Sequence, residues 1–369
     1  MKKIINDPSN VVEEMVTGLA GMYPQYVERI PGTAALVRSD KDSMTGKVGL
    51  VSGGGSGHEP AHAGYVGKGM LTAAVCGQVF TSPTPDQIYE AIKAADQGKG
   101  VFLIVKNYSG DVMNFDMAKD LAAMDDIEVR SIVVDDDIAV ENSLYTQGRR
   151  GVAGTVFMHK ILGAAADQGA SLDEIEELAK AVLPHINTIG VALSAATVPE
   201  VGKPGFVLAD DEIEYGVGIH SEPGYRREKI KPSKDLAQEL LSKIDESLKL
   251  SAQLTLRALR NFWATGHNSA SSSLTRFSQV QTAWLKPLLW AKTSSTVNLA
   301  PWFWATTSST ATALLTCWKT PLRTRKLAGQ RFLAITSTIR NASGLLNLTR
   351  MATLFPSKKS QLSQRATTP

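Results

Sequence analysis

Acidic residues are absent from the last third of this chain of 369 residues, where Glu246 is the final carboxylate side chain. Residues 251–369 hold 15 lysines and arginines, all six tryptophans and only three of the 30 glycines. A change in composition this sharp indicates a different kind of sequence. We therefore expect residues 251–369 to be an atypical basic tail that is not natively folded.

Cysteines and long apolar runs are scarce as well. Cys76 and Cys317 are the only cysteines, which argues against a disulfide framework and favours a reducing compartment. The lysines of the first ten residues are not followed by the apolar run of a signal peptide. No apolar stretch reaches the roughly 18 residues that a membrane-spanning helix needs. The sequence therefore predicts a soluble, cytoplasmic protein.

Strand and helix patterns alternate through the first half of the chain. Apolar, β-branched runs lie at residues 47–51, 71–76, 100–106 and 127–134. Helix patterns lie at residues 10–21, from 84 onward, and at 115–124, 152–166 and 171–182, the last with a capping box of Ser171 and Glu174. Such alternation is typical of a parallel sheet covered on both faces. We predict an α/β fold whose first domain, residues 1–184, has three layers.

A second, smaller α/β domain is expected from residue 185. Its predicted elements are a strand at 188–194, a hairpin over 206–220 that turns at Asp210 and Asp211, and a helix at 236–248. Because the basic tail does not continue this pattern, we predict that the second domain, residues 185–250, is incomplete.

The segment VSGGGSGHEPAHAG, residues 51–64, is the strongest local signal of a site. Glycines let the backbone approach a small ligand closely, and histidines titrate near neutral pH. The glycines are not followed by the Gly-Lys-Ser/Thr of a nucleotide P-loop, and His58 and Pro60 occupy the places open to the third glycine of a dinucleotide fingerprint. The segment predicts a small ligand other than a nucleotide, with an ordinary glycine-rich turn as the alternative.

Polar side chains follow several of the predicted strands. His58 follows the first, Lys106 and Asp111 the third, and residues 135–137, all aspartates, the fourth. The carboxyl ends of strands in open α/β sheets line a ligand crevice, so these groups are expected to converge.

Several of these residues have a second interpretation. Asp111 suits a helix cap as well as a chemical role, and the aspartates 135–137 suit helix caps or a solvated loop. His62 is a candidate for orienting His58. Arg149 and Arg150 are interpreted as a salt-bridging or interface pair.

Six ordered segments together resemble the dihydroxyacetone kinase family, in particular its separate substrate-binding subunit. They are residues 52–64, 80–88, 106–115, 134–140, 145–155 and 202–224. The resemblance is nearly continuous from Met1 to about Leu250 and stops there.

The resemblance implies that a triose ketone is held as a covalent hemiaminal on the imidazole of His220. An unprotonated ring nitrogen adds to a carbonyl, whereas glycerol offers no electrophilic carbon. His58 would be a general acid/base, and Asp111 would accept the proton of the hydroxyl that is phosphorylated. Substrate contacts are implied for Gly55, Ser56, Gly57, His58, Lys106 and Asp111. Without the resemblance, the position of His220 at a strand end favours a satisfied structural histidine.

The resemblance also implies that this chain binds no cofactor or metal. The fused, ATP-using members hold magnesium on aspartates of a C-terminal domain, and a tail without carboxylates cannot supply them. We therefore expect ADP or ATP with magnesium on a nucleotide-binding kinase subunit that a phosphocarrier subunit recharges. We expect a homodimer with no nucleic-acid or membrane partner.

Two alternatives stay open. The tail has the composition of translation in a wrong reading frame, although a purposely basic tail for nucleic acid or membrane is the other hypothesis. The chain as a whole suits a ketone-binding coactivator or sensor that partners a transcription regulator. A sensor needs His220 but has no use for a general base, so His58 and Asp111 favour the kinase subunit.

Overall fold

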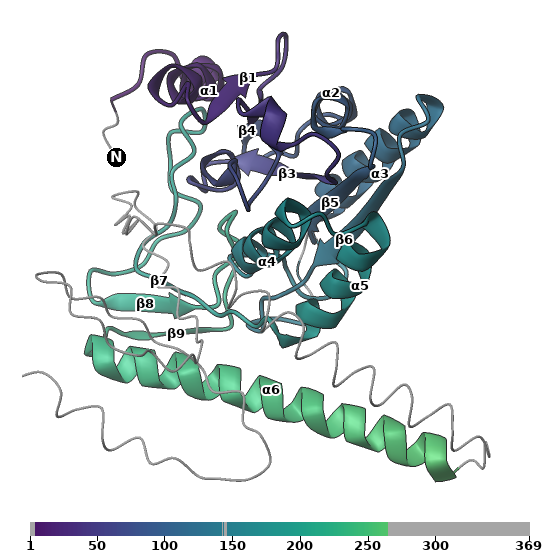
Figure 1. Ribbon diagram of the computed structural model, residues 1–369. Coiled ribbons are helices and arrows are strands. Elements are labelled where there is room, and N and C mark those ends of the chain that lie inside the picture. The colour runs from purple at the N-terminus through teal and green to yellow at the C-terminus, as the bar shows by residue number, and fades with distance from the viewer. Residues whose placement is uncertain (1–3, 142, 144–145, 265–369) are drawn as a thin grey trace, which may run out of the picture. The chain divides into compact units, whose positions relative to one another are not determined.

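A six-stranded sheet organises the first half of the chain (Figure 1). The computed structural model describes residues 4–141, 143 and 146–264, with the backbone alone for 251–264. In spatial order the strands are β1 (Val27–Arg29), β2 (Ala35–Arg38), β4 (Ala73–Val79), β3 (Gly49–Ser56), β5 (Val101–Lys106) and β6 (Val129–Val134). Strands β3 to β6 run parallel, whereas β1 and β2 add an antiparallel edge beside β4.

The four parallel strands confirm the strand predictions, with shifts at their ends. Strand β3 extends through the glycines to Ser56, so much of the segment predicted as a loop is a strand. Strands β1 and β2 were not predicted, because they are short and β1 is interrupted by the charges of Glu28 and Arg29.

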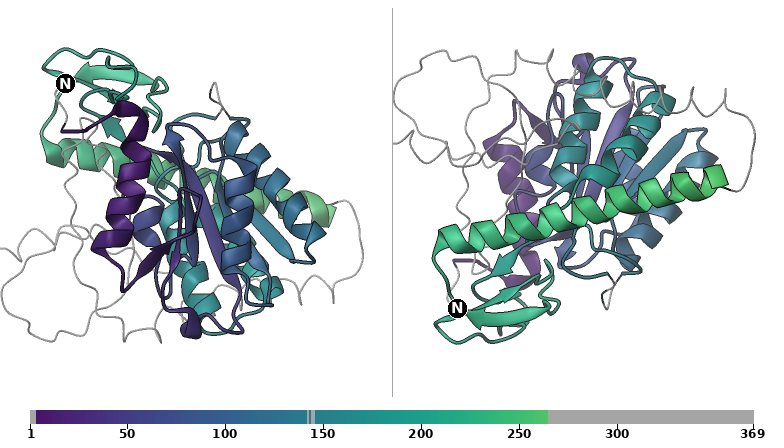
Figure 2. Two further views of the ribbon diagram at one scale, coloured as in Figure 1. Left: turned by 90° about the horizontal axis from the view of Figure 1, so that it is seen from above. Right: turned by 90° about the horizontal axis from the view of Figure 1, so that it is seen from below.

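Helices cover both faces of this sheet, as Figures 1 and 2 show. One face packs against α1 (Val11–Met22), α4 (Thr155–Asp167) and α5 (Leu172–Val182), and the other against α2 (Pro85–Ala95) and α3 (Ser109–Met124). Strand β5 supplies Phe102 and Ile104 to the first core and Leu103 to the second, as the alternation of a strand requires. The prediction of a three-layer α/β arrangement with a mostly parallel sheet is confirmed.

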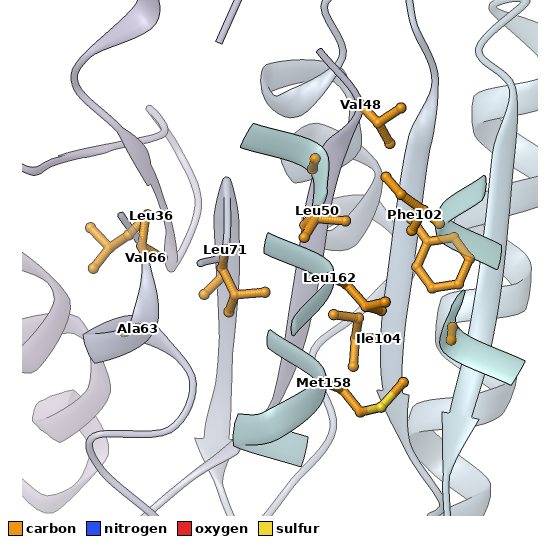
Figure 3. Packing of buried hydrophobic residues seen from close by; sticks show 14 of the residues in the cluster. Leu36, Val48, Leu50, Ala63, Val66, Leu71, Phe102, Ile104, Met158 and Leu162 are labelled. Carbon is orange, nitrogen blue, oxygen red and sulfur yellow. The ribbon is translucent and has the colours of Figure 1, made fainter. Parts of the chain in front are cut away.

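The first of these cores lies between the sheet and helix α4. Figure 3 shows Met158 and Leu162 of α4 beside Leu50 and Ile104 of the sheet. All four side chains are fully buried. The predicted capping box of Ser171 and Glu174 is present at the start of α5.

A separate three-stranded antiparallel sheet follows. It consists of β7 (Val191–Ala192), β8 (Glu212–Tyr215) and β9 (Arg226–Lys229), with β8 in the middle, and α6 (Ser233–Ala264) comes after it. Short 3-10 helices at Pro8–Asn10, Lys41–Ser43, Ala63–Tyr65 and Leu183–His185 lie between the other elements. Within the described ranges no helix is long and apolar enough to cross a membrane.

The hairpin predicted over residues 206–220 is wrong. Residues 206–209 form no strand, and β8 pairs instead with β7 and with the charged strand β9. Strand β8 ends where Gly216 takes a φ of +73° and opens a loop, residues 216–225, that carries His220. Helix α6 also runs beyond the predicted end at residue 248. The predictions for residues 265–369 lie outside the described residues.

A buried junction joins the end of β6 to the start of α4 and to the second sheet. Asp136 accepts hydrogen bonds from the backbone N–H groups of Val152 and Gly154, each at 2.8 Å, and from the hydroxyl of Thr188 at 2.5 Å. Burial raises the pKa of Asp136, although these hydrogen bonds oppose the shift. Asp137 is also buried, so the solvated-loop interpretation is wrong for both residues and holds only for the exposed Asp135.

Substitution of Asp136 by alanine should destabilise the protein strongly, because the backbone N–H groups of Val152 and Gly154 and the buried hydroxyl of Thr188 lose their acceptor. We expect Asp136→Ala to lower the free energy of unfolding by about 3 kcal/mol. The matched control Asp135→Ala should change it by less than about 0.5 kcal/mol. Urea denaturation followed by circular dichroism measures both. A change in the free energy of unfolding for Asp136→Ala as small as that for Asp135→Ala would show that the junction contributes little to stability.

Candidate functional site

The glycines near the carboxyl end of β3, residues 53–55, form the floor of the candidate site and are called the glycine floor below. Gly54 and Gly55 pair with Cys76 and Gly77 of β4, and the hydroxyl of Ser56 donates a hydrogen bond to the carbonyl of Gly77 at 2.7 Å. A Cβ on Gly55 would lie 2.6 Å from the backbone nitrogen of Thr81. The sequence thus uses glycine here because the chain that follows β4 passes too close for any side chain.

His58 follows this strand and lies against Phe80. The two rings stack with centroids 5.0 Å apart and planes 6° apart. Burial, reinforced by the positive charge of Lys106, holds the pKa of His58 well below its usual range. Its Nε2 atom is buried and has no hydrogen-bond partner among the described residues. His58 is therefore a neutral imidazole with one nitrogen available to a ligand.

Lys106 and Asp111 lie on the other side of the glycine floor. Lys106 ends β5, Asp111 lies in the first turn of α3, and both side chains are buried. A Cβ on Gly54 would lie 3.3 Å from the Lys106 Nζ atom and 3.6 Å from the Asp111 Oδ2 atom, so both groups border this glycine.

Burial shifts both charges toward neutrality. It raises the pKa of Asp111, opposed by Lys106, and it lowers the pKa of Lys106, opposed by Asp111. The Oδ1 atom of Asp111 is buried without a hydrogen-bond partner among the described residues. Helix α3 begins after Tyr108, so Asp111 is not its capping residue. A carboxylate with a raised pKa and a free oxygen is suited to accept a proton.

His220 approaches from the loop between β8 and β9. Its ring centroid lies 4.6 Å from that of Tyr108, 4.9 Å from that of His58 and 5.4 Å from that of Phe80, each contact being edge to face. The backbone N–H of His220 donates to Glu222 Oε2 at 2.9 Å, and its Nδ1 lies 3.3 Å from Glu222 Oε1. The structure therefore places His220 beside His58, from which it is separated by 162 positions in the sequence.

Three residues of the site were not predicted: Phe80, Tyr108 and Glu222. Phe80 and Tyr108 lie next to the ends of β4 and β5, like the residues that were predicted, but the sequence analysis did not single them out. Glu222 is two residues after His220, a spacing that in a tight loop places a carboxylate beside a ring. That signal was available in the sequence.

His62, which was a candidate for orienting His58, contacts other residues. Its Nδ1 atom lies 3.0 Å from the Nε2 atom of His159 and 3.3 Å from the hydroxyl of Ser52. Burial lowers the pKa of both rings, that of His159 to about 3. His62 therefore ties the segment after the glycines to α4 and β3, and no described contact joins it to His58.

The predicted salt-bridging pair divides into two different roles. The fully buried Arg150 forms an ion pair of 2.6 Å with Asp137, which confirms the salt-bridging role for this residue. Arg149 instead donates a long hydrogen bond of 3.4 Å to the side chain of Asn187.

A mostly parallel α/β sheet with a glycine floor, two facing imidazoles and a buried lysine and aspartate defines a small-ligand site. The family model of the Dak1 domain matches residues 17–268. The chain belongs to the Dak1 domain family.

Individual relatives are similar over the same part of the chain. The dihydroxyacetone-binding subunit DhaK of the PTS-dependent dihydroxyacetone kinase from Lactococcus lactis is 68% identical over 251 residues, covering 68% of this chain and 75% of that protein. The DhaKLM operon coactivator DhaQ of the same organism is 47% identical over 242 residues, covering 66% and 73%. The crystal structure of the dihydroxyacetone kinase from C. freundii with AMP-PNP and Mg²⁺ has a TM-score of 0.61 and 35% identity, covering 66% of this chain and 45% of that one.

The glycine floor should not tolerate even one added methyl group. We expect Gly55→Ala to lower the Tm by about 4 °C or more, because its Cβ meets the backbone of Phe80 and Thr81. The control Gly67→Ala places its Cβ in open space and should leave the Tm unchanged. Thermal melts followed by circular dichroism test this. An unchanged Tm for Gly55→Ala would mean that residues 80–81 can move aside at little energetic cost.

Proposed function

We propose that this chain binds dihydroxyacetone as a covalent hemiaminal on His220 and presents it for phosphorylation by a nucleotide-bearing partner subunit. The observation that carries the proposal is that His220 lies beside His58, next to the glycines Gly53 to Gly55 of β3. The identity of 68% with a dihydroxyacetone-binding subunit supports the same ligand.

The adduct forms by addition of a ring nitrogen to the carbonyl carbon. Glu222 can only accept a hydrogen bond, so Nδ1 of His220 carries the proton and Nε2 keeps its lone pair. As the C–N bond forms, the π electrons of the carbonyl move to its oxygen, which takes up a proton. The neutral His58 relays that proton from water, releasing a proton from one ring nitrogen as the other nitrogen takes one up, and the relay runs in reverse when the ketone is released. The substituted ring of His220 then carries the positive charge beside the carboxylate of Glu222. No water is lost in the addition.

The remaining groups orient the bound triose. The backbone at Gly55 and Gly57, with the hydroxyl of Ser56, borders the hydroxyl groups of the ligand, and Lys106 gives a further polar contact. Glycerol has the same hydroxyls but no carbonyl, so it cannot form the adduct. Selectivity then arises from a covalent bond that only a carbonyl compound can make.

Asp111 serves the phosphoryl-transfer step. Its raised pKa suits a base that accepts the proton of the attacking hydroxyl as the phosphoryl group arrives. ADP or ATP with magnesium is held by the partner kinase subunit, which a phosphocarrier subunit recharges; the name of the Lactococcus lactis relative, PTS-dependent, supports this arrangement. The chain acts as a homodimer in the cytoplasm and takes no nucleic-acid or membrane partner.

A coactivator function is the second candidate, because DhaQ is 47% identical. Such a protein would bind the ketone on His220 and transmit its presence to a transcription regulator. Asp111 distinguishes the two functions, since ketone binding alone requires no base for a hydroxyl proton.

Replacement of His220 by alanine should abolish covalent capture while the fold is kept. Native mass spectrometry of the wild type with dihydroxyacetone should show a gain of one complete triose, and His220→Ala should show none. The control His185→Ala, at an exposed histidine outside the site, should keep the adduct. A gain smaller by one water would instead indicate a Schiff base on Lys106, and an undiminished adduct on His220→Ala would refute the proposal.

Asp111→Asn should keep the adduct but lower turnover by about 100-fold or more, as expected for a lost general base. The assay measures dihydroxyacetone phosphate formed with the partner subunits of a related kinase. Asp116→Asn, on the exposed face of the same helix, is the control and should be fully active. Normal turnover of Asp111→Asn would show that Asp111 is not the base, and a wild type that forms the adduct but gives no turnover would favour the coactivator function.

A further inference from the structure

Glu222 is a buried carboxylate that lies beside His220, two residues along the same loop. It accepts the backbone N–H of His220 and lies within hydrogen-bonding distance of its Nδ1 atom. Burial alone would raise the pKa of Glu222, but the hydrogen bonds from His220 oppose burial, and the pKa lies below its usual value. The side chain is therefore an anion whose main partner is the ring of His220.

The loop around Glu222 fixes the direction of this contact. The backbone N–H of Gly218 donates to the carbonyl of Glu222 at 3.0 Å, and that of Ser221 donates to the carbonyl of Gly218 at 3.1 Å. A Cβ on Gly218 would lie 2.0 Å from Glu222 Oε2, so the carboxylate occupies the space that glycine leaves open. Glu222 and His220 thus form one closed turn.

Arg150 holds this turn to the first sheet. Its Nη2 atom donates to the carbonyl of Gly216 at 2.7 Å, and its Nη1 atom borders the same space above Gly218, 2.6 Å from a Cβ placed there. Asp137 pairs with the same guanidinium. The Nη1 atom has no hydrogen-bond partner among the described residues, so its positive charge faces the Glu222 side of the loop.

We infer that Glu222 is a positioning residue for His220, which it holds in the Nδ1–H tautomer with Nε2 directed at the ligand. Arg150 holds the loop that carries both residues through its hydrogen bond to the carbonyl of Gly216. An imidazole left to itself populates both neutral tautomers, and only one of them presents an unprotonated Nε2. Loss of the orienting carboxylate in a histidine-based site is costly chiefly because the wrong tautomer then forms. The expected effect of Glu222 on adduct formation rests on the proposed function, whereas its expected effect on the tautomer of His220 does not.

The test compares two isosteric substitutions in the full chain. Glu222→Gln offers an amide that can donate to Nδ1 and so favours the unreactive Nε2–H tautomer; we expect its affinity for dihydroxyacetone to fall roughly 10-fold or more. Glu214→Gln is the matched control, because Glu214 is equally buried and accepts the N–H of Gly224 but does not contact His220. Its affinity should stay within about twofold of the wild type.

A second readout does not depend on ligand binding. Nitrogen-15 chemical shifts of the histidine rings in the ligand-free protein report the tautomer directly, and a purely structural role of Glu222 would not move them. We expect Nδ1–H at His220 in the wild type and in Glu214→Gln, and a shift toward Nε2–H in Glu222→Gln.

The results distinguish the positioning role of Glu222 from the proposed capture of the ketone on His220. An Nε2–H tautomer in the wild type, or an unchanged tautomer and affinity in Glu222→Gln, would overturn the positioning role. A wild type that shows the Nδ1–H tautomer, lost in Glu222→Gln, but forms no adduct would support the positioning role and refute the proposed function. If Glu222→Gln does not fold, the wild-type tautomer still decides.

Discussion

Three consecutive glycines of strand β3, residues 53–55, have no room for side chains, and the site is arranged around that constraint. Backbone or side-chain atoms of neighbouring residues lie within 3.3 Å of the Cβ position at Gly53, Gly54 and Gly55. The chain after β4 can therefore cross close above the floor, which places Phe80 where it stacks on His58. The same absence lets Lys106 and Asp111 lie over the strand end from β5 and α3. Larger residues in β3 would displace all of these groups at once.

The burial of many polar and charged groups in the candidate site costs desolvation free energy. A buried charge is tolerated only when it is paired or hydrogen-bonded, and replacing such pairs by apolar residues is often neutral or stabilising. Lys106 and Asp111 border one another at Gly54, Arg150 pairs with Asp137, and Glu222 faces His220. The unpartnered atoms of His58, Tyr108 and Asp111 lie among these groups. Because these atoms make no hydrogen bond to the described residues, a ligand that hydrogen-bonds to them would remove the energetic cost of leaving them unpaired.

The sequence predicted well what short-range patterns encode. Strands β3 to β6 were evident as β-branched runs, and the capping box of α5 as a Ser-x-x-Glu spacing. The convergence of His58, Lys106 and Asp111 followed from their positions after parallel strands. The hairpin at 206–220 failed because two aspartates resemble a turn, while the true partner of β8 is a strand of four charged residues, RREK, that has no apolar alternation. His220 was identified by family resemblance, because nothing in its immediate sequence distinguishes a nucleophile from a structural histidine.

What local sequence could not reveal is how the two sheets share one site. The link is made by a few buried groups between the end of β6 and the second sheet. The backbone of Thr188 bonds to the backbone of Asp136 and Ile138, and Arg150 reaches from Asp137 to the carbonyl of Gly216. Because Gly216 begins the loop that carries His220, the position of His220 depends on the ion pair of Arg150 with Asp137, two residues that are not among the proposed ligand contacts. The integrity of this junction, more than that of either sheet, determines whether His220 meets the glycine floor.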